Sequence, residues 1–479
     1  MKLEEYVTFD AVGLGQLVKN KHITPSELAE LAISAAKAVN EQINAAVEIF
    51  EPESIIKINH SDAVFSGVPC FKKDLGSVIA GCSYESGSRL TLRVKTPMTD
   101  DFADRMLKSG LQILGRAACS EFGASITTES IANGPTCNPW NTNFSAGGSS
   151  GGSAALVAAG VVPIAHTNDG GGSTRIPASM CGNVGLKTSR GLVSHAPNGN
   201  ELTSPLVSEL CNSRTVRDTA AFLDVVRSTG LGEATYKGRD HDHSFLDQLG
   251  NAPAKYKIAF SSESWGGVSM DSSIKSELER VASLLSELGH DVEEITPKVV
   301  MSGKYWNYFQ TIIYFFTYMQ IDFWVGVLGT KPSLENLEPV TLQIYEAGSR
   351  ISAKQCADAW SYFNHAGRRF GSFFQDYDLL LTPTVNQMTP HIGSDLALSS
   401  KLDLESWCDL MRKYVPQSPI ANLIGIPAIS VPVALGPEGL PLGMQFFGAM
   451  GTEAKLLDIA HQLETAAPWL DRRPVVFAI

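Results

Sequence analysis

Short apolar runs alternate with longer helical patterns along this chain of 479 residues. Runs such as GVPCF, LQILG, VVPIAH, YKIAF, YDLLLT and AISVPVAL have the length of single strands, whereas SSIKSELERVASLLSEL and EAKLLDIAHQLE carry apolar residues at helical spacing. This alternation predicts an α/β fold in which helices cover a mixed or parallel sheet. Near the start, the segment TPSE at residues 24–27 combines an N-cap hydroxyl, a first-turn proline and a capping-box glutamate, which predicts a helix that runs to about Val39.

The composition is that of a globular protein with much apolar surface to bury. Hydrophobic residues make up 44% of the chain and charged residues 18%, and the charged share is below the roughly 25% of an average soluble protein, which argues against disorder. The net charge of −12 argues against a nucleic-acid partner. No linker, charge block or internal repeat divides the chain, so we expect a single domain.

Three features bear on cellular location. The N-terminus, MKLEEYVTFD, lacks the basic start and apolar run of a signal peptide, and the eight cysteines are scattered without a CxxC pair. The most apolar long stretch, from Ile312 to Leu328, is interrupted by Gln320 and Asp322 and is too short to cross a bilayer comfortably, so we interpret it as buried or pocket-lining. We therefore expect a cytoplasmic protein with no membrane partner.

Glycine and serine gather in two loops, SAGGSSGGS at residues 145–153 and DGGGSTR at residues 169–175. The first loop precedes a helix-like run and the second follows a strand-like run, so both can meet at one edge of the sheet, where glycines let backbone N–H groups surround a small target. A phosphate cradle is one use, but no Gly-Lys-Ser/Thr ending follows either loop. A nucleophile elbow is another, because residues 147–151 match GxSxG, but no apolar strand precedes them. The third use is a serine nucleophile with a second serine as proton relay, which needs a lysine within reach.

A candidate lysine stands upstream, in the segment GVPCFKKD at residues 67–74. This segment reads as an apolar strand that runs into two lysines, and the alternation of a strand aims Lys72 and Lys73 at opposite faces. We expect one of them to be buried and the other solvated, and the alternation alone leaves open which. Neither HExxH nor a Cys/His cluster occurs in the sequence, so no metal and no cofactor is expected.

Taken together, these motifs resemble one known family. GVPxxxKDL, GGSSGGSAA and DGGGSTRIPASxCGxxGLK occur in the order and at the separations of the amidase signature family, the Ser-cisSer-Lys amide hydrolases. The resemblance continues through GPTCNPWN, YDLLLTPTV, GIPAISVPV and PLGMQFFG, and so covers roughly residues 60 to 470. It implies a central twisted mixed sheet of about eleven strands with helices on both sides. It also implies one amidase domain over residues 1–479, with a helical preface over residues 1–60 and a core over residues 60–470.

The resemblance also implies a role for individual residues. Lys73 matches the family's catalytic lysine, Ser149 the bridging serine and Ser173 the nucleophile, which together would hydrolyse an amide through an acyl-serine intermediate. Lys72 is then the structural lysine of the pair. The backbone N–H groups of the nucleophile loop match the oxyanion hole, and the peptide bond before Ser149 is cis in the family. The oxyanion hole is assigned to Gly170, Gly171, Gly172 and Ser173, and structural support to Gly148, Ser150, Asp169 and Arg175.

The substrate region is expected within residues 300–370, the variable part of the family. Ten of the twenty positions from Tyr305 to Trp324 are aromatic, against 8% of the whole chain. Large apolar pockets are lined in this way, which favours a bulky apolar or aryl amide over a small polar one. The residues assigned to substrate binding are Thr127, Thr128, Tyr305, Phe309 and Phe316.

Several alternatives remain open at this stage. Within the family, TPTVNQMTPHIGSD and APWLDRRP are most similar to the branch that contains 6-aminohexanoate cyclic dimer hydrolase, although the nucleophile loop DGGGS departs from that branch. A glutamine-hydrolysing subunit of a tRNA-dependent amidotransferase is the rival within the family, but the segment after TSRG does not resemble that subunit. Outside the family, a non-catalytic phosphate-ligand binding module would use the same loops and would leave the position of Lys73 unexplained. A homodimer is also left open.

Overall fold

A computed structural model describes the whole chain except residues 59–61, 198, 200–205, 229, 231, 233–242, 252, 264 and 301–302. Its centre is an eleven-stranded sheet with the strand order β1-β3-β2-β8-β10-β9-β14-β15-β13-β11-β12. The pairs β2–β3, β2–β8, β11–β12 and β11–β13 are parallel and the other six pairs are antiparallel, so the sheet is mixed. The strands are β1 (Ala46–Ile49), β2 (Pro69–Lys73), β3 (Gln112–Ala117), β8 (Ile164–Asp169), β9 (Val184–Lys187), β10 (Ser208–Ser213), β11 (Lys257–Phe260), β12 (Asp291–Glu294), β13 (Leu379–Pro383), β14 (Ala428–Leu435) and β15 (Pro441–Gly448).

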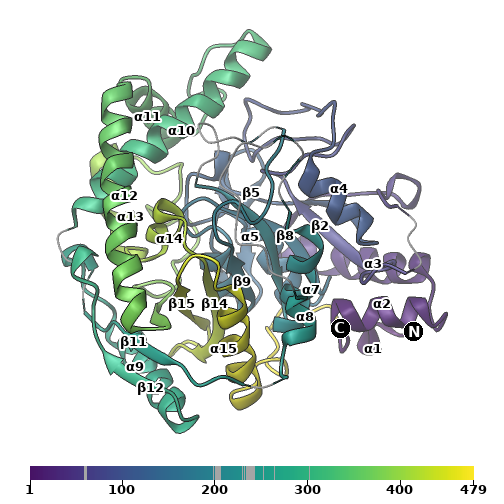
Figure 1. Ribbon diagram of the computed structural model, residues 1–479. Coiled ribbons are helices and arrows are strands. Elements are labelled where there is room, and N and C mark those ends of the chain that lie inside the picture. The colour runs from purple at the N-terminus through teal and green to yellow at the C-terminus, as the bar shows by residue number, and fades with distance from the viewer. Residues whose placement is uncertain are drawn as a thin grey trace.

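Helices cover both sides of this sheet, as predicted for the fold (Figure 1). Helices α5 and α6 pack on each other and on the middle strands, and α7 and α15 form a second such pair. Two small hairpins, β4–β5 (Glu129–Ser130, Gly134–Pro135) and β6–β7 (Cys137–Asn138, Asn141–Ser145), lie outside the sheet. The helices are α1 (Leu3–Tyr6), α2 (Ala11–Lys19), α3 (Pro25–Ile43), α4 (Asp101–Lys108), α5 (Gly151–Ala158), α6 (Arg175–Cys181), α7 (Val216–Val226), α8 (Phe245–Gln248), α9 (Ser272–Glu287), α10 (Lys304–Leu328), α11 (Pro339–Gly348), α12 (Ala353–Asp376), α13 (Leu404–Tyr414), α14 (Ser418–Ile424) and α15 (Glu453–Ala466).

The N-terminal helices lie beside β1, β2 and β3 at one end of the molecule (Figure 1). Helix α3 begins with the predicted capping box, in which the Thr24 side chain accepts from the Glu27 backbone and Glu27 accepts from the Thr24 N–H. The helix ends at Ile43, one turn beyond the predicted end near Val39, because Ile43 is still fully buried and Asn44 then adopts a left-handed conformation with a φ of 45°.

Helices α10 to α13 lie together at the other side of the sheet (Figure 1). A second apolar cluster joins α10, α12 and α14 to strands β13 and β15. Helix α10 has 25 residues and by length and apolar composition alone could cross a membrane, and 22% of its most apolar stretch is buried. The run from Ile312 to Leu328 forms the second part of this helix and is mostly not buried, so only the expectation that it lines a pocket remains, which is taken up below.

The topology brings both Gly/Ser loops to one edge of the sheet. Strands β2 and β8 are neighbours and parallel, so Lys73 at the end of β2 and Asp169 at the end of β8 lie at the same edge. The loop that carries Ser149 leads directly into α5, which packs on β2 and β8, and the loop that carries Ser173 leads into α6. Three separate segments of the chain therefore meet at the carboxyl ends of the two strands, the usual place of a site in such sheets.

Gly152 provides a test of how closely α5 approaches the sheet. A Cβ atom at this position would collide with the backbone N of Ala118 and the backbone O of Ala45, neither of which can rotate away. We expect Gly152→Ala to lower the free energy of unfolding by about 1–3 kcal/mol or more, measured by urea unfolding. Gly371→Ala on α12 is the matched control: no atom lies within 4 Å of the added methyl, so a gain of about 0.5–1 kcal/mol is expected. Equal effects of the two substitutions would contradict the close packing.

Candidate active site

Lys73 lies at the centre of the site, with its side chain fully buried. Its Nζ atom lies 2.7 Å from Ser149 Oγ, 2.8 Å from Ser150 Oγ and 2.6 Å from Asn168 Oδ1. Burial lowers the pKa of Lys73 to about 8, although the nearby charges of Glu209 and Asp169 act in the opposite direction. Near neutral pH, a fraction of the molecules therefore holds this amine uncharged.

The first Gly/Ser loop is held tightly around Ser149. The Gly148–Ser149 peptide bond is cis, and a Cβ at Gly148 would lie 2.7 Å from the Ser125 backbone O. The Thr128 hydroxyl donates to the Gly147 carbonyl at 2.8 Å and accepts from the Gly151 N–H at 3.1 Å. Ser149 is 1% exposed, so the loop presents its hydroxyl to Lys73 from a fixed backbone.

The second loop is held by the buried pair Asp169 and Arg175. The guanidinium donates to both carboxylate oxygens, at 2.9 and 3.0 Å, and Asn422 donates to the same carboxylate at 2.9 Å. Burial alone would raise the pKa of Asp169, but the adjacent Arg175 charge lowers it to about 2, so the carboxylate is ionised. Asp169 Oδ1 also accepts from the Gly172 N–H at 2.7 Å. Gly172, assigned from the sequence to the oxyanion hole, therefore already donates its N–H within the loop.

Lys72 is buried as well, contrary to the expectation that one lysine of the pair would be solvated. It is 2% exposed, its Nζ donates to the Lys73 carbonyl at 2.8 Å, and the ammonium lies 5.7 Å from the centre of the Tyr84 ring. The reason is that the segment after β2 folds back over this face of the strand, where Asp74 accepts from the Glu85 N–H. Both faces of β2 are therefore covered.

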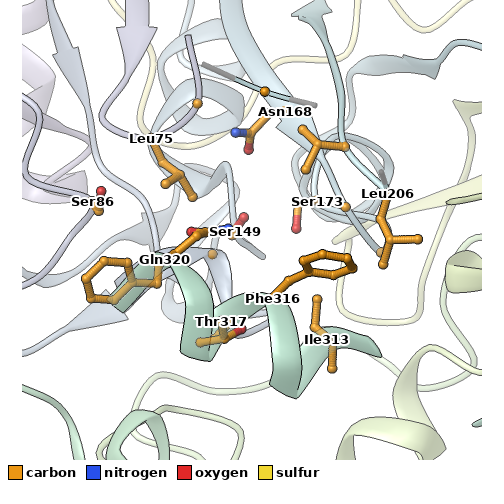
Figure 2. Close-up of a pocket in the computed structure, with 18 of the residues that line it drawn as sticks. Leu75, Ser86, Ser149, Asn168, Ser173, Leu206, Ile313, Phe316, Thr317 and Gln320 are labelled. Atoms are coloured by element: carbon orange, nitrogen blue, oxygen red, sulfur yellow. The ribbon is translucent and has the colours of Figure 1, made fainter. Parts of the chain in front are cut away.

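A cavity of about 700 Å³ opens beside the two loops. Ser149, Ser173 and Asn168 line one side of it, and the Phe316 and Ile313 side chains of α10 lie across from them (Figure 2). The ring of Phe309 lies so close to the nucleophile loop that a Cβ at Gly171 would be 3.2 Å from it. The aromatic residues of α10 that line the cavity are Trp306, Phe309, Tyr314, Phe316, Phe323 and Trp324. One face of this helix is thus pocket-lining, as expected from the sequence.

Three of the residues assigned to substrate binding lie elsewhere. Thr127 and Thr128 are 1% exposed and do not line the cavity; Thr128 instead holds the serine loop through the hydrogen bonds given above. Tyr305 is also 1% exposed, and its hydroxyl donates to the Pro416 carbonyl at 2.7 Å, so it anchors α10. Phe309 and Phe316 do line the cavity.

Sequence reasoning missed two polar residues of the site, Asn168 and Glu209. Both are buried, line the cavity and face each other across the pair β8–β10. Asn168 directly precedes the motif, and its place next to an identified loop could have drawn attention to it. Glu209 had no such signal, because it lies 41 positions further along the chain and comes beside Asn168 only through strand pairing. Within the described residues, no group of three or more His, Cys, Asp or Glu side chains could hold a metal ion.

Comparison with known proteins decides the family. The sequence model of the family described as Amidase matches residues 27–457. The chain belongs to the amidase family. It is 32% identical to 6-aminohexanoate-cyclic-dimer hydrolase of Pseudomonas sp. strain NK87 over 97% of this chain and 96% of that protein. This amidase is thus an amidohydrolase, which excludes a non-catalytic phosphate-binding module.

Solved structures agree with this assignment. The structure of 6-aminohexanoate cyclic dimer hydrolase in complex with its substrate superposes with a TM-score of 0.90 and 30% identity, over 98% of this chain and 99% of that one. A bacterial aryl acylamidase of the amidase signature family superposes with a TM-score of 0.83 and 25% identity, over 97% of this chain and 99% of that one. The fold of this amidase is therefore the amidase signature fold.

The lowered pKa of Lys73 makes a prediction about stability. In the unfolded chain a lysine keeps its proton to about pH 10.4, whereas folded Lys73 releases it near pH 8. Between these pH values the unfolded state binds more protons than the folded state. The contribution of Lys73 to the free energy of unfolding therefore rises with pH. The free energy of unfolding of the wild type, minus that of Lys73→Met, should rise by about 2 kcal/mol from pH 7 to pH 10.

Chemical denaturation at several pH values would measure this difference. Lys37→Met, at an exposed position on α3, is the control for the loss of a lysine charge. A difference between the wild type and Lys73→Met that does not change with pH would show that Lys73 keeps its ordinary affinity for protons in the folded state.

Proposed function

We propose that this amidase cleaves the C–N bond of a carboxylic amide through an acyl intermediate on Ser173, with Ser149 and Lys73 as the proton relay. The observation that carries the proposal is the 2.7 Å contact between Lys73 Nζ and Ser149 Oγ at the wall of a cavity that Ser173 also lines. A buried amine with an uncharged form, in contact with a hydroxyl, is what activation of a serine requires.

The energy needed to use Lys73 as a base is modest. At pH 7, deprotonation of an ordinary lysine costs about 4–5 kcal/mol. With the pKa of Lys73 lowered to about 8 by burial, the same step costs about 1.4 kcal/mol. Burial therefore removes most of the free energy needed to deprotonate Lys73 at pH 7. The reaction rate should rise from neutral toward mildly alkaline pH as Lys73 loses its proton.

The proton relay balances in both half-reactions. Ser173 Oγ forms a bond to the amide carbon as its proton passes to Ser149 Oγ and the Ser149 proton passes to Lys73 Nζ. Collapse of the tetrahedral intermediate breaks the C–N bond, and the proton returns from Lys73 through Ser149 to the leaving nitrogen. Water then attacks the acyl-Ser173 ester by the same path, which releases the carboxylic acid and restores the hydroxyl.

The negative charge on the carbonyl oxygen needs hydrogen-bond donors. Gly170, Gly171 and Ser173 are the candidates, because the Gly172 N–H is taken by Asp169. Among the described residues, the Gly171 and Ser173 N–H groups have no intramolecular acceptor. Each donor of this kind typically lowers the barrier by about 2.7–4 kcal/mol. The ion pair of Asp169 and Arg175 would then act by holding these N–H groups in place.

The cavity supports a bulky apolar or aryl acyl group as substrate. Six aromatic side chains of α10 line it, and Phe309 packs on the nucleophile loop itself. Pockets with such a lining bind large apolar groups. The names of two similar proteins, an aryl acylamidase and a cyclic dimer hydrolase of 6-aminohexanoate, point to the same range of amides. A glutamine amide, small and charged, would leave most of this space unfilled.

A serine-directed probe tests the relay. Intact-mass measurement after a fluorophosphonate should show one adduct on the wild type, none on Ser173→Ala, and labelling of Ser149→Ala slowed by at least about a hundredfold, because the proton path is broken. Ser150→Ala is the matched control. Its hydroxyl lies equally close to Lys73 but does not line the cavity, so it can orient the amine but cannot pass a proton to Ser173, and the loss should be at least about tenfold smaller than that of Ser149→Ala. Equal losses for Ser149→Ala and Ser150→Ala would contradict the bridging role.

The aromatic side chains of α10 that line the cavity lead to a prediction about substrate specificity. Phe309→Ala removes the ring next to the nucleophile loop, so kcat/KM for an aryl amide should fall by about tenfold to a hundredfold, the effect of losing about 1.4–3 kcal/mol of contact. Hydrolysis of acetamide should fall by a clearly smaller factor, because its two-carbon acyl group can bury far less apolar surface against the ring than an aryl group can. Tyr308→Ala, on the same turn but outside the cavity lining, is the control. Equal losses for both amides would contradict a specificity role for Phe309.

A further inference from the structure

A buried chain of polar side chains leads from Lys73 through Asn168 and Glu209 to His166. Lys73 Nζ contacts Asn168 Oδ1 at 2.6 Å, and Asn168 Nδ2 points to Glu209 Oε1 at 3.5 Å. Glu209 Oε2 lies 2.7 Å from His166 Nε2. Glu209 lies directly opposite Asn168 in the β8–β10 pair, and His166 lies two residues before Asn168, on the same face of β8. A Cβ at Gly76 would overlap both Asn168 and Glu209, so the two side chains are closely covered.

The hydrogen bonds assign the direction of each group. Glu209 is ionised, because the hydrogen bond from His166 and neighbouring positive charge bring its pKa below the ordinary value despite burial. A carboxylate only accepts, so His166 Nε2 carries the proton, and burial lowers the pKa of His166, which keeps the ring neutral. The same carboxylate requires the NH₂ end of Asn168 to face it. Asn168 Oδ1 is thereby fixed toward Lys73.

This arrangement leaves one hydrogen-bonding site of the neutral Lys73 amine, its lone pair, for Ser149. An uncharged amine has two N–H donors and one lone pair. Asn168 Oδ1 can only accept, so it takes one N–H. The Ser150 hydroxyl donates to the Asn168 carbonyl at 3.3 Å, so toward Lys73 it can only accept, and it takes the other N–H. The lone pair is left for the hydroxyl proton of Ser149.

We propose that Asn168 and Glu209 are positioning residues of the relay: Glu209 fixes the Asn168 amide, Asn168 directs the lone pair of Lys73 to Ser149, and the Glu209 carboxylate sets the pH range in which Lys73 is neutral. This inference rests on the proposed function. It adds two residues that touch neither the scissile bond nor the nucleophile in the mechanism above.

The charged surroundings make Glu209 the acid to alter. Facing Lys73 are Lys72 on β2, Cys119 after β3, Asp169 on β8 and Glu209 on β10. Burial raises the pKa of Cys119 to about 12, so this thiol is uncharged, and Asp169 is paired with Arg175. Glu209 itself is faced by His166, His195, Lys72, Lys73, Tyr84 and Asp100. Of the two acids near Lys73, Glu209 is therefore the one without an arginine partner among the described residues.

The first test removes the Glu209 charge and keeps its shape. In Glu209→Gln, the midpoint of the alkaline rise in kcat/KM should move down by about 0.5–1 pH unit, because loss of a nearby negative charge favours the neutral amine. A purely structural role would lower the rate without moving the midpoint. Asp100→Asn is the control: Asp100 also lines the cavity but caps α4, and its replacement should leave the midpoint in place.

The second test removes the acceptor. Asn168→Leu keeps a similar volume but cannot accept from Lys73, so kcat should fall by about a hundredfold while KM stays within about twofold. If Glu209 orients Lys73 through Asn168, the double variant that combines Asn168→Leu with Glu209→Gln should have a kcat no lower than that of Asn168→Leu alone. A further large loss in kcat, beyond the single variant, would overturn this path.

Direct titration of Lys73 separates this inference from the proposed function. The enzyme labelled with carbon-13 at the lysine ε carbon, with the Lys73 signal assigned through Lys73→Met, reports the Lys73 midpoint by NMR without any turnover. We expect this midpoint and the kinetic midpoint to move down together in Glu209→Gln. An unchanged lysine midpoint would overturn the role of Glu209 and leave the relay standing. A lysine midpoint that moves while the rate profile stays would instead overturn the relay.

Discussion

The burial of the Lys73 amine is the constraint on which the site depends. A buried amine without hydrogen-bond partners costs several kcal/mol, so each of its positions must meet an acceptor or donor. The partners come from two segments besides its own strand: Ser149 and Ser150 from the loop before α5, and Asn168 from β8. The parallel pairing of β2 with β8 and the packing of α5 on both strands supply this geometry. The strand pairing and helix packing that form the fold therefore also place the hydrogen-bond partners of Lys73.

Burial alone does not single out the lysine that we propose as the base. Lys72, Lys73 and Lys187 are all buried, and burial lowers the pKa of each, to about 7 in the case of Lys187. Lys72 and Lys187 each donate to the carbonyl of the next residue, a group that has no proton to give. Only Lys73 of these three contacts a hydroxyl at the cavity wall. The chemistry of the partner, more than the size of the pKa shift, distinguishes the three.

The sequence predicted the parts of this structure that depend on local pattern or on motif order. Alternating strands and helices, the capping box at Thr24 and the positions of Lys73, Ser149 and Ser173 all belong to that class. The burial of Lys72 could not be predicted, because it depends on a segment that folds back over β2. The assignment of Tyr305 to substrate binding was also wrong, because α10 carries aromatic residues on more than one face. Periodicity cannot tell the cavity side of the helix from the core side. Glu209 reaches the site only through strand pairing.

The position of Glu209 and Asn168 on the cavity wall links substrate binding to the charge of Lys73. A substrate that fills the cavity removes water from the site, and this lowers the pKa of a buried amine. Removal of the same water strengthens the attraction between the Glu209 carboxylate and the Lys73 ammonium, which raises that pKa. The two effects oppose each other. The carboxylate therefore offsets part of the loss of proton affinity that Lys73 undergoes as the cavity fills, and in the proposed relay a lysine must both take the proton from Ser149 and return it to the leaving nitrogen.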